Sequence, residues 1–364
     1  MSKFYSKLKK TIRLLVKNNE YVNMDSYYPT EQHKSKKEII YDQLFFLWKY
    51  GDFEKYYFTY GFDRKEMTRK KICEEYIINE KAFLRKIDEH NNHINKKQGR
   101  FSGRAILSDK FYFYLFLKSL DIPTPKILYY TRNGKLFYSN NIEDNGVESI
   151  LTHDIDGFAK PYGGQLGNGA FALQIKDSKM FVNKELVVDN NDLIRTFTET
   201  KYIIQERIVQ HPQLNKLCSS AVNTIRLLTL ITPDEEIIAI RAGLRIGREG
   251  SNVDNCAKGG IFVGIDMNTG KLMKNGIIKP PYGTMILQHP DSKIVFEGFE
   301  IPYFMEAVKK AKELHSKLYR VHSVGWDIAI TQDGPMFIEG NSLWEISGTQ
   351  AAVGGLKFIE KYFD

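Results

Sequence analysis

The stretch "GWDIAITQDGPMFIEGN", residues 325–341, contains two short apolar strands separated by a Gln-Asp-Gly turn. Three of its side chains, however, are polar ones that a buried sheet excludes unless something compensates for their burial. If residues 332–334 form a three-residue hairpin loop with Gly334 in the left-handed conformation, Asp327 lies directly opposite Glu339. The sequence therefore predicts a hairpin that brings two carboxylates together.

Two carboxylates about 4 Å apart repel by roughly 4 kcal/mol at an effective dielectric of about 20, so this pair needs a proton or a cation. Strand alternation adds Asn341 to the face of Asp327 and Glu339. Carboxylates and an amide oxygen suit a hard cation, and magnesium on few protein oxygens usually carries phosphates as further ligands. The alternative is an edge hairpin with solvated acids. The opposite face is expected to fill a core with Ile328, Ile330, Met336 and Ile338.

Composition indicates an ordinary soluble globular protein, because 42% of its 364 residues are hydrophobic and 26% are charged. A chain of this length is expected to divide into two or three lobes. Its three cysteines have no paired spacing, which argues against a disulfide framework or a zinc site and predicts a reducing cytoplasmic location. No apolar run approaches the roughly eighteen residues of a membrane span, and no signal-peptide core is recognisable.

The net charge of +8 favours anionic partners. Part of the excess lies in residues 1–20, where six lysines and arginines face a single glutamate and apolar residues recur at helical spacing. This segment predicts either a helix that packs on its own domain or a peripheral contact with the cytoplasmic membrane face. A nucleic-acid partner is not expected, because no helix-turn-helix, zinc or ribonucleoprotein pattern accompanies the charge.

The chain changes character along its length. Residues 1–100 are predicted to form a mainly helical region, and residues 101–364 a strand-rich α+β domain. A helix capped by Ser108 or Asp109 opens this domain. The domain is expected to contain one lobe at about 125–210 and a second at about 211–364.

A glycine-rich segment, "FAKPYGGQLGNGAF" at residues 158–171, lies between two strand-like runs. It is not a Walker loop, because Lys160 precedes the glycines and no Gly-Lys-Ser/Thr opens a helix. Such a loop can fold over a triphosphate while the upstream lysine neutralises charge, or it can be a flexible hairpin tip. The glycines concerned are Gly163, Gly164, Gly167 and Gly169.

Taken in order, the strand lysine, the glycine loop, "YIIQERI", "NTIR" and the final Asp…Glu-x-Asn cluster resemble the ATP-grasp superfamily. The resemblance runs from about residue 110 to residue 348. Within the superfamily, "NTIR" and "GWDIAIT…GPMFIEGNSLW" look most like sugar-transfer-associated ATP-grasp proteins found with polysaccharide genes. The resemblance implies two α+β lobes around ATP and an amide-forming ligase that acts through an acylphosphate. It also implies a uronic-acid-type sugar and an amino acid or ammonia as substrates, and it leaves a homodimer open.

The resemblance also implies roles for individual residues. Lys110 and Lys160 would hold phosphates under the glycine loop, and Arg226 and Arg245 would face the transferring phosphoryl group and the substrate carboxylate, a task suited to guanidinium groups. Magnesium would be bound by Asp327, Glu339 and Asn341.

The same resemblance makes "IQERI" the strand that meets adenine, through Gln205, Glu206 and Ile208. One departure concerns the ribose, because many relatives place an acid shortly after this strand. This chain has "VQHPQLN" instead, which leaves His211 as the substitute.

Two other activities compete with the ligase. A kinase of the same fold would pass the phosphoryl group to a hydroxyl or carboxylate acceptor and would need no amine. A glycosyltransferase would use Asp154 and Asp156 as a DxD metal motif, a pattern of low specificity.

Overall fold

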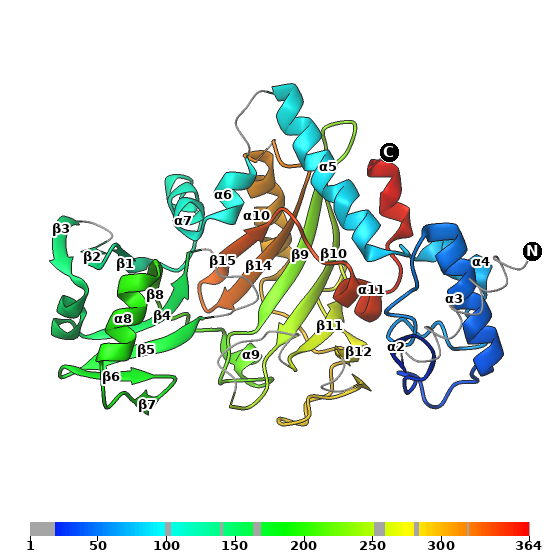
Figure 1. The fold of residues 1–364 in the computed structure, drawn as a ribbon, viewed down its shortest axis with the longest axis horizontal. Coiled ribbons are helices and arrows are strands. Elements are labelled where there is room, and N and C mark those ends of the chain that lie inside the picture. Colours follow the sequence, from blue (N-terminus) through cyan, green and yellow to red (C-terminus); the bar gives the residue numbers. More distant parts are fainter. Residues whose placement is uncertain are drawn as a thin grey trace, which may run out of the picture.

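The computed structural model describes residues 19–98, 103–138, 141–162, 169–250, 259–279, 284–318 and 320–363. Two antiparallel sheets make up the strand-rich part, and the first helices, α2 Asn19–Val22, α3 Lys36–Tyr50 and α4 Arg69–Glu75, lie at the end of the molecule away from the first sheet (Figure 1). The predicted α+β class with a helical N-terminal region is therefore confirmed. Within the described residues, no helix has both the length and the apolar character that a membrane crossing requires.

Sequence signals account for the ends of the helices that precede the first sheet. The side chains of Ser35 and Glu38 form a capping box at the start of α3, and Gly51 ends this helix with φ +81°. At α7, Asp109 is the cap, since its carboxylate accepts hydrogen bonds from the backbone of Phe111 and Tyr112. The helices are α2 Asn19–Val22, α3 Lys36–Tyr50, α4 Arg69–Glu75, α5 Glu80–Gln98, α6 Arg104–Ser108 and α7 Lys110–Ser119.

The first sheet has eight strands in the order β3-β2-β1-β8-β4-β5-β6-β7. It packs against α8, Asn191–Glu199, whose Phe197 is buried in the core of this lobe. The strands are β1 Ile127–Arg132, β2 Lys135–Tyr138, β3 Asn141–Gly146, β4 Ile155–Pro161, β5 Phe171–Lys176, β6 Lys179–Val182, β7 Glu185–Leu186 and β8 Tyr202–Glu206.

The second sheet has seven strands in the order β13-β12-β11-β10-β9-β14-β15. The helices α9 Pro212–Asn215, α10 Phe304–Ser316 and α11 Ser347–Val353 accompany it. The strands are β9 Thr224–Ile231, β10 Ile237–Ile246, β11 Ile261–Ile265, β12 Leu272–Ile278, β13 Met285–Ile286, β14 Ser323–Thr331 and β15 Gly334–Asn341.

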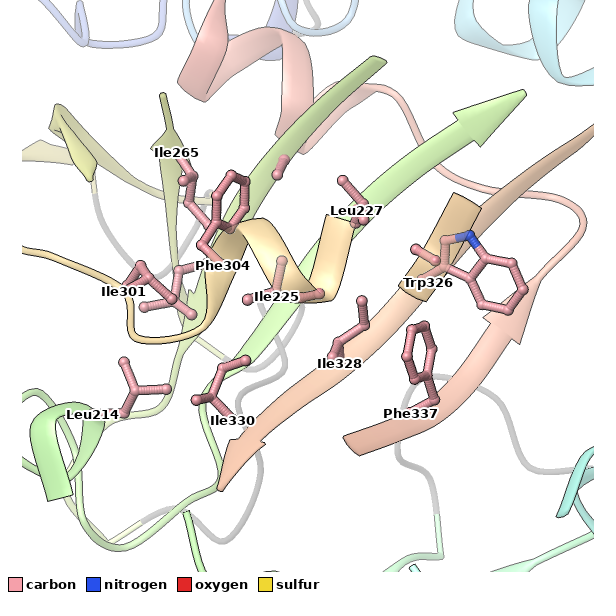
Figure 2. Packing of buried hydrophobic residues seen from close by; sticks show 14 of the residues in the cluster. Leu214, Ile225, Leu227, Ile265, Ile301, Phe304, Trp326, Ile328, Ile330 and Phe337 are labelled. Atoms are coloured by element: carbon pink, nitrogen blue, oxygen red, sulfur yellow. The ribbon is translucent and has the colours of Figure 1, made fainter. Parts of the chain in front are cut away.

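Alternation along β9 and β14 sorts the second sheet into two faces. Ile225 and Leu227 on β9 pack with Ile328 on β14 and with Phe304 of α10 in the largest core (Figure 2). The residues between them, including Asp327, point to the other face. The functional residues therefore lie on the face opposite α10.

The β14–β15 hairpin differs from its predicted register in two ways that cancel. Thr331 pairs with Gly334, so the loop is one residue shorter than expected, and a bulge between Asp327 and Ile328 accommodates one extra residue on β15. Asp327 consequently lies opposite Glu339, as predicted. The prediction that Gly334 has positive φ is also confirmed, with φ +114°.

The bulge corrects the predicted core face of β15. Phe337 pairs with Ile328 and is fully buried, whereas Met336 and Ile338 are half-buried and were wrongly expected to fill the core. A bulge shifts the two-residue period of a strand by one position, so the side chains beyond it exchange faces.

The N-terminal region packs directly on the second sheet. Phe83 and Ile87 of α5 share a core with Leu228 of β9 and with Trp344. The buried amide of Gln350 joins the two parts, because it accepts a hydrogen bond from the Ile77 backbone nitrogen at 2.9 Å and donates one to the Ile77 oxygen at 3.1 Å.

Candidate active site

Asp327 lies at the centre of a group of charged side chains on the second sheet. It is buried on β14, directly opposite Arg226 of β9 on one side and Glu339 of β15 on the other. Its Oδ1 lies 2.8 Å from Arg226 Nε, and its Oδ2 accepts a hydrogen bond from Arg226 Nη2 at 3.2 Å. Antiparallel pairing alone thus sets an arginine and a second carboxylate beside this aspartate.

Arg245 on β10 reaches the same carboxylate from the next strand. Its Nη1 donates to Asp327 Oδ2 at 3.1 Å. Strand β10 brings it there because Gly243 pairs with Arg226, and Arg245 stands two positions farther along on the same face.

Room for the guanidinium of Arg226 depends on Gly325. A Cβ at this position would lie 3.1 Å from Arg226 Nη1 and 2.8 Å from the Cβ of Trp344. A glycine on β14 is therefore required where the arginine and Trp344 approach the strand.

Two lysines from other parts of the chain complete the group. Lys110 begins α7, and Lys160 lies on β4 of the first sheet. The charges of both lysines act on Glu339, and burial lowers the pKa of Lys160 to about 8, an effect to which nearby Lys110 contributes. The site thus lies where α7 and both sheets meet.

Burial raises the pKa of both carboxyl groups of the Asp327–Glu339 pair, and for Glu339 repulsion by Asp327 adds to the effect. Arg245 and Lys160 oppose this shift. The four basic side chains of this group therefore outnumber its two carboxylates. A surplus of positive charge around two acids favours a polyanion such as a nucleoside triphosphate.

The oxygen donors at this site fit a hard divalent cation. Asp327 Oδ1 is buried and accepts no well-aligned hydrogen bond, although Arg226 Nε lies 2.8 Å from it, and Glu339 lies opposite Asp327. The Asn341 amide donates to the Gly325 oxygen at 3.3 Å and supplies a third side-chain oxygen. Among the residues described by the structure, His, Cys, Asp and Glu alone form no metal-binding group of three or more.

The residues predicted to meet the nucleotide base have defined structural contacts. Gln205 is buried on β8 and donates to the Pro125 oxygen at 3.0 Å, and Glu206 accepts from the Lys126 backbone nitrogen at 2.9 Å. Both side chains thus hold the start of β1 against β8. Ile208 follows the strand and is half-buried.

His211, predicted to contact ribose, caps α9. Its Nδ1 accepts a hydrogen bond from the Gln213 backbone nitrogen at 3.1 Å, and its backbone nitrogen donates to the Ile330 oxygen at 2.7 Å. The histidine therefore fixes the connection between the two sheets beside the end of β14.

Of the predicted glycine loop, Gly169 has φ +72° and its carbonyl accepts a hydrogen bond from the Tyr202 hydroxyl at 3.0 Å. The other three glycines, Gly163, Gly164 and Gly167, lie outside the described residues. The loop follows β4 directly, so it begins two residues after Lys160.

The Asp154-Ile-Asp156 tripeptide stands apart from this charged group. Both aspartates are exposed, and Asp156 on β4 lies 3.6 Å from Arg207 Nη1. Asp156 belongs to strand β4.

Sequence reasoning missed a second polar group beside Arg245. Lys279 donates hydrogen bonds to Glu345 and to Ser347, and the charge of Arg245 helps to hold the pKa of Glu345 below its usual range against its burial. Glu80 of α5 accepts from the Ser347 backbone nitrogen at 3.2 Å. An acid just beyond Asn341 was a signal in the sequence, but nothing there indicated its distant partner Lys279.

Solved structures similar to this chain include ligases and synthetases. An N5-carboxyaminoimidazole ribonucleotide synthetase in an ADP complex has a TM-score of 0.39 and 11% identity, over 67% of this chain and 46% of that one. D-alanine–D-alanine ligase from Bacillus anthracis complexed with ATP has a TM-score of 0.35 and 14% identity, over 69% of this chain and 60% of that one. D-alanyl-alanine synthetase A from Vibrio cholerae has a TM-score of 0.38 and 14% identity, over 72% of this chain and 65% of that one.

The chain thus spans between about half and two thirds of the length of these structures. No curated protein matches it. Residues 89–358, however, match the family described as sugar-transfer associated ATP-grasp, and this range includes α7, both sheets and all the charged residues around Asp327. The chain therefore belongs to the sugar-transfer associated ATP-grasp family and has the ATP-grasp fold.

Proposed function

We propose that this protein is an ATP- and Mg²⁺-dependent carboxylate-amine ligase that forms an amide through an acylphosphate. The observation that carries the proposal is the contact of Arg226 and Arg245 with Asp327, beside Glu339 and two lysines. Phosphoryl transfer depends on alignment and charge neutralisation rather than on a nucleophilic side chain, and this group of residues offers those two properties.

The lysines and arginines divide the anionic reactants between them. Lys110 and Lys160 bind the phosphates of ATP, with the glycine loop after β4 closing over them. Arg226 and Arg245 orient the γ-phosphoryl group and the substrate carboxylate, whose planar oxygens match a guanidinium. Asp327, Glu339 and Asn341 hold Mg²⁺, which supplies neutralisation of phosphate charge when bound.

The chemistry balances in two steps. A carboxylate oxygen attacks the γ-phosphorus, the bond to the β-phosphate oxygen breaks, and ADP leaves. The amine nitrogen then attacks the acyl carbon, a C–N bond forms, inorganic phosphate leaves, and the amine loses a proton. The net reaction consumes one acid, one amine and one ATP.

We further propose a uronic-acid-type sugar as the acid and an amino acid or ammonia as the amine, in surface polysaccharide biosynthesis. The family description supports the sugar, and the positive charge of the chain supports an anionic one. The adenine would lie against the backbone of β8 at Gln205, Glu206 and Ile208, and His211 would face the ribose. A cytoplasmic location and a homodimer stay predictions.

A matrix assay tests this function. The protein, ATP and Mg²⁺ are incubated with uronic-acid sugars and amines in all pairs, and ADP, phosphate and product mass are followed. A product equal to acid plus amine minus water, formed with ADP and phosphate, is expected. A gain of one phosphoryl group on a single acceptor would instead establish a kinase.

The glycosyltransferase alternative has its own discriminator. If Asp154 and Asp156 held the metal, Asp154→Ala would abolish metal-dependent turnover and Glu339→Ala would not. We expect the reverse, because Glu339 lies beside Asp327 and the lysines whereas Asp154 is exposed and away from them.

A further inference from the structure

Helix α3 buries one side and exposes the other. Ile39, Asp42, Gln43 and Phe46 are buried, and Phe46 packs in an aromatic core with Tyr57 and other residues of the N-terminal region. This side attaches the helix firmly to the rest of the molecule, so the opposite side is presented to solvent in a fixed orientation.

The solvent side carries three aromatic residues in a row. Tyr41, Phe45 and Trp48 are spaced four and three residues apart, which places them on one side of the helix. Trp48 is 81% exposed and Tyr41 60%, while Phe45 is half-buried. We call these three residues the aromatic stripe. Exposure of large aromatic side chains to water is unfavourable, and their transfer into the apolar part of a surface is favourable.

Cations surround the aromatic stripe. Lys37 is exposed one turn before Tyr41, and Lys49 Nζ lies 5.6 Å from the centre of the Phe45 ring. Arg69 of α4 also lies over Phe45, with its guanidinium carbon 5.6 Å from the ring centre. The aromatic rings and the positive charges thus form one continuous surface.

The acids of α3 offset this charge only in part, because Asp42 pairs with Arg69 at 2.7 Å. Glu38 is held in the capping box, where it accepts hydrogen bonds from the Ser35 backbone and hydroxyl at 2.6 and 2.7 Å. Asp42 is buried and accepts from Lys34, Tyr57 and Arg69. Of the charges that α3 presents outward, the positive ones therefore dominate beside the stripe.

The position of α3 leaves the active site accessible. It lies at the end of the molecule opposite the first sheet, with the second sheet between them (Figure 1). A large flat partner at this end can therefore bind without covering the site at Asp327. The preceding residues 1–18, which lie outside the described part, add six cations and no acid in sequence.

We propose that the aromatic stripe, with Lys37, Lys49 and Arg69, is a docking surface for an anionic lipid membrane. Tyrosine and tryptophan favour the headgroup level of a bilayer, and surrounding basic residues are attracted to anionic headgroups. Lysine is depleted in protein–protein interfaces, so this mixture favours a lipid surface over a protein partner.

The tryptophans of the chain provide the measurement. Trp326 and Trp344 are fully buried, so Trp48 is the one of the three whose emission can respond to a surface. The 364-residue chain is titrated with vesicles of equal parts phosphatidylglycerol and phosphatidylcholine, and in parallel with phosphatidylcholine alone. A blue shift of emission and co-sedimentation are expected with the anionic vesicles only, and both should weaken as salt is added.

Variants locate the contact. Tyr41→Ala and Trp48→Ala should each reduce co-sedimentation, and Lys37→Glu with Lys49→Glu should reduce vesicle affinity by at least about 5-fold per lysine. Tyr112→Ala is the matched control, because Tyr112 is also 60% exposed but lies on α7. All five positions are exposed, so thermal unfolding should be unchanged.

Several outcomes would overturn the proposal. One is the absence of any emission shift or sedimentation with anionic vesicles. Another is a blue shift that follows protein concentration without lipid, since this would assign the stripe to a second copy of the chain. Undiminished sedimentation of the α3 variants would likewise overturn it, because binding would then reside elsewhere, such as in residues 1–18.

Discussion

At the residue scale, the site is an aspartate with neighbours fixed by strand pairing. Arg226 and Glu339 flank Asp327 on the adjacent strands, and Arg245 reaches it from one strand farther away. Asp327 and the two arginines belong to inner strands of the sheet and Glu339 to its edge strand β15, so strand pairing rather than a loop holds each of them. The lysines, in contrast, arrive from a helix end and from the other sheet.

Glu339→Gln should give a folded protein whose magnesium-dependent turnover is reduced at least about 100-fold. The substitution keeps the shape of the side chain and removes a negative charge from a place where burial and Asp327 disfavour it. The melting temperature should therefore be unchanged or higher. Glu313→Gln on the exposed side of α10 is the control, and turnover equal in the two variants would refute the metal role.

Under the proposed function, Lys160 should make nucleotide binding depend on pH. Its pKa of about 8 lies below the ordinary lysine value of 10.5, so the ammonium loses its proton as pH rises through about 8. Affinity for ATP should fall above this pH, by up to about tenfold per pH unit. Lys160→Arg stays charged and should abolish the dependence, whereas Lys160→Ala should bind weakly at every pH. Equilibrium titration with ATP at a series of pH values measures this affinity. An affinity of the wild type that does not change with pH would contradict the role of Lys160.

At the element scale, the hairpin illustrates what sequence could predict. Alternation and turn chemistry placed Asp327 opposite Glu339 correctly, although the loop was one residue too long and the bulge was not foreseen. A bulge has no marker in this stretch, since Ile338 looks like any core residue. Phe337 is buried in its stead because it packs edge-to-face on Trp326, a tertiary contact that no local pattern encodes.

Gly334→Ala should lower the free energy of unfolding by about 1–2 kcal/mol. The residue has φ +114°, where a Cβ is strained whatever space surrounds it. Gly348→Ala is the opposite case, because Gly348 lies in α11 and its Cβ would make ordinary contact with Phe262 at 3.7 Å. That variant should be neutral or stabilising by up to about 1 kcal/mol. Urea unfolding of both proteins compares them, and equal losses would contradict the reason given.

At the scale of the whole molecule, the N-terminal region is joined by buried contacts to the segment that follows the second sheet. Gln350 bonds to Ile77, Glu80 supports Ser347, and Phe83 packs against Trp344. The sequence predicted this region as helical but gave no sign of its docking. The gathering of Lys110, Lys160 and the strand arginines was indicated by family resemblance and not by spacing, because distances across two sheets are set by tertiary packing.

Two buried histidines should make the fold sensitive to acid. His315 accepts from the Thr229 hydroxyl and donates to the Val321 oxygen, an arrangement that requires the neutral ring. Burial lowers the pKa of His315 to about 4. It lowers that of His322 to about 3, and the neighbouring charges of His90 and His315 add to the effect.

Because these values lie below the unfolded value of 6.5, the unfolded chain binds more protons as pH falls below 6.5. Stability is present above that pH and is lost toward pH 4, by up to about 1.4 kcal/mol per pH unit for each histidine. Urea unfolding over this pH range should show that the free energy of unfolding of His315→Gln depends less steeply on pH than that of the wild type. Identical slopes for the variant and the wild type would count against the assignment.

The contact of Asp327 with Arg226 and Arg245 affects how either arginine would bind an anion. A guanidinium offers a limited set of N–H groups in one plane, and here Asp327 already occupies part of that set on both arginines. An incoming carboxylate or phosphate therefore takes part in an exchange of one anion for another rather than in the filling of an open site. Under the proposed function, Asp327 would compete with the incoming anion for both arginines, and the affinity for that anion would depend on the difference between two similar ion pairs.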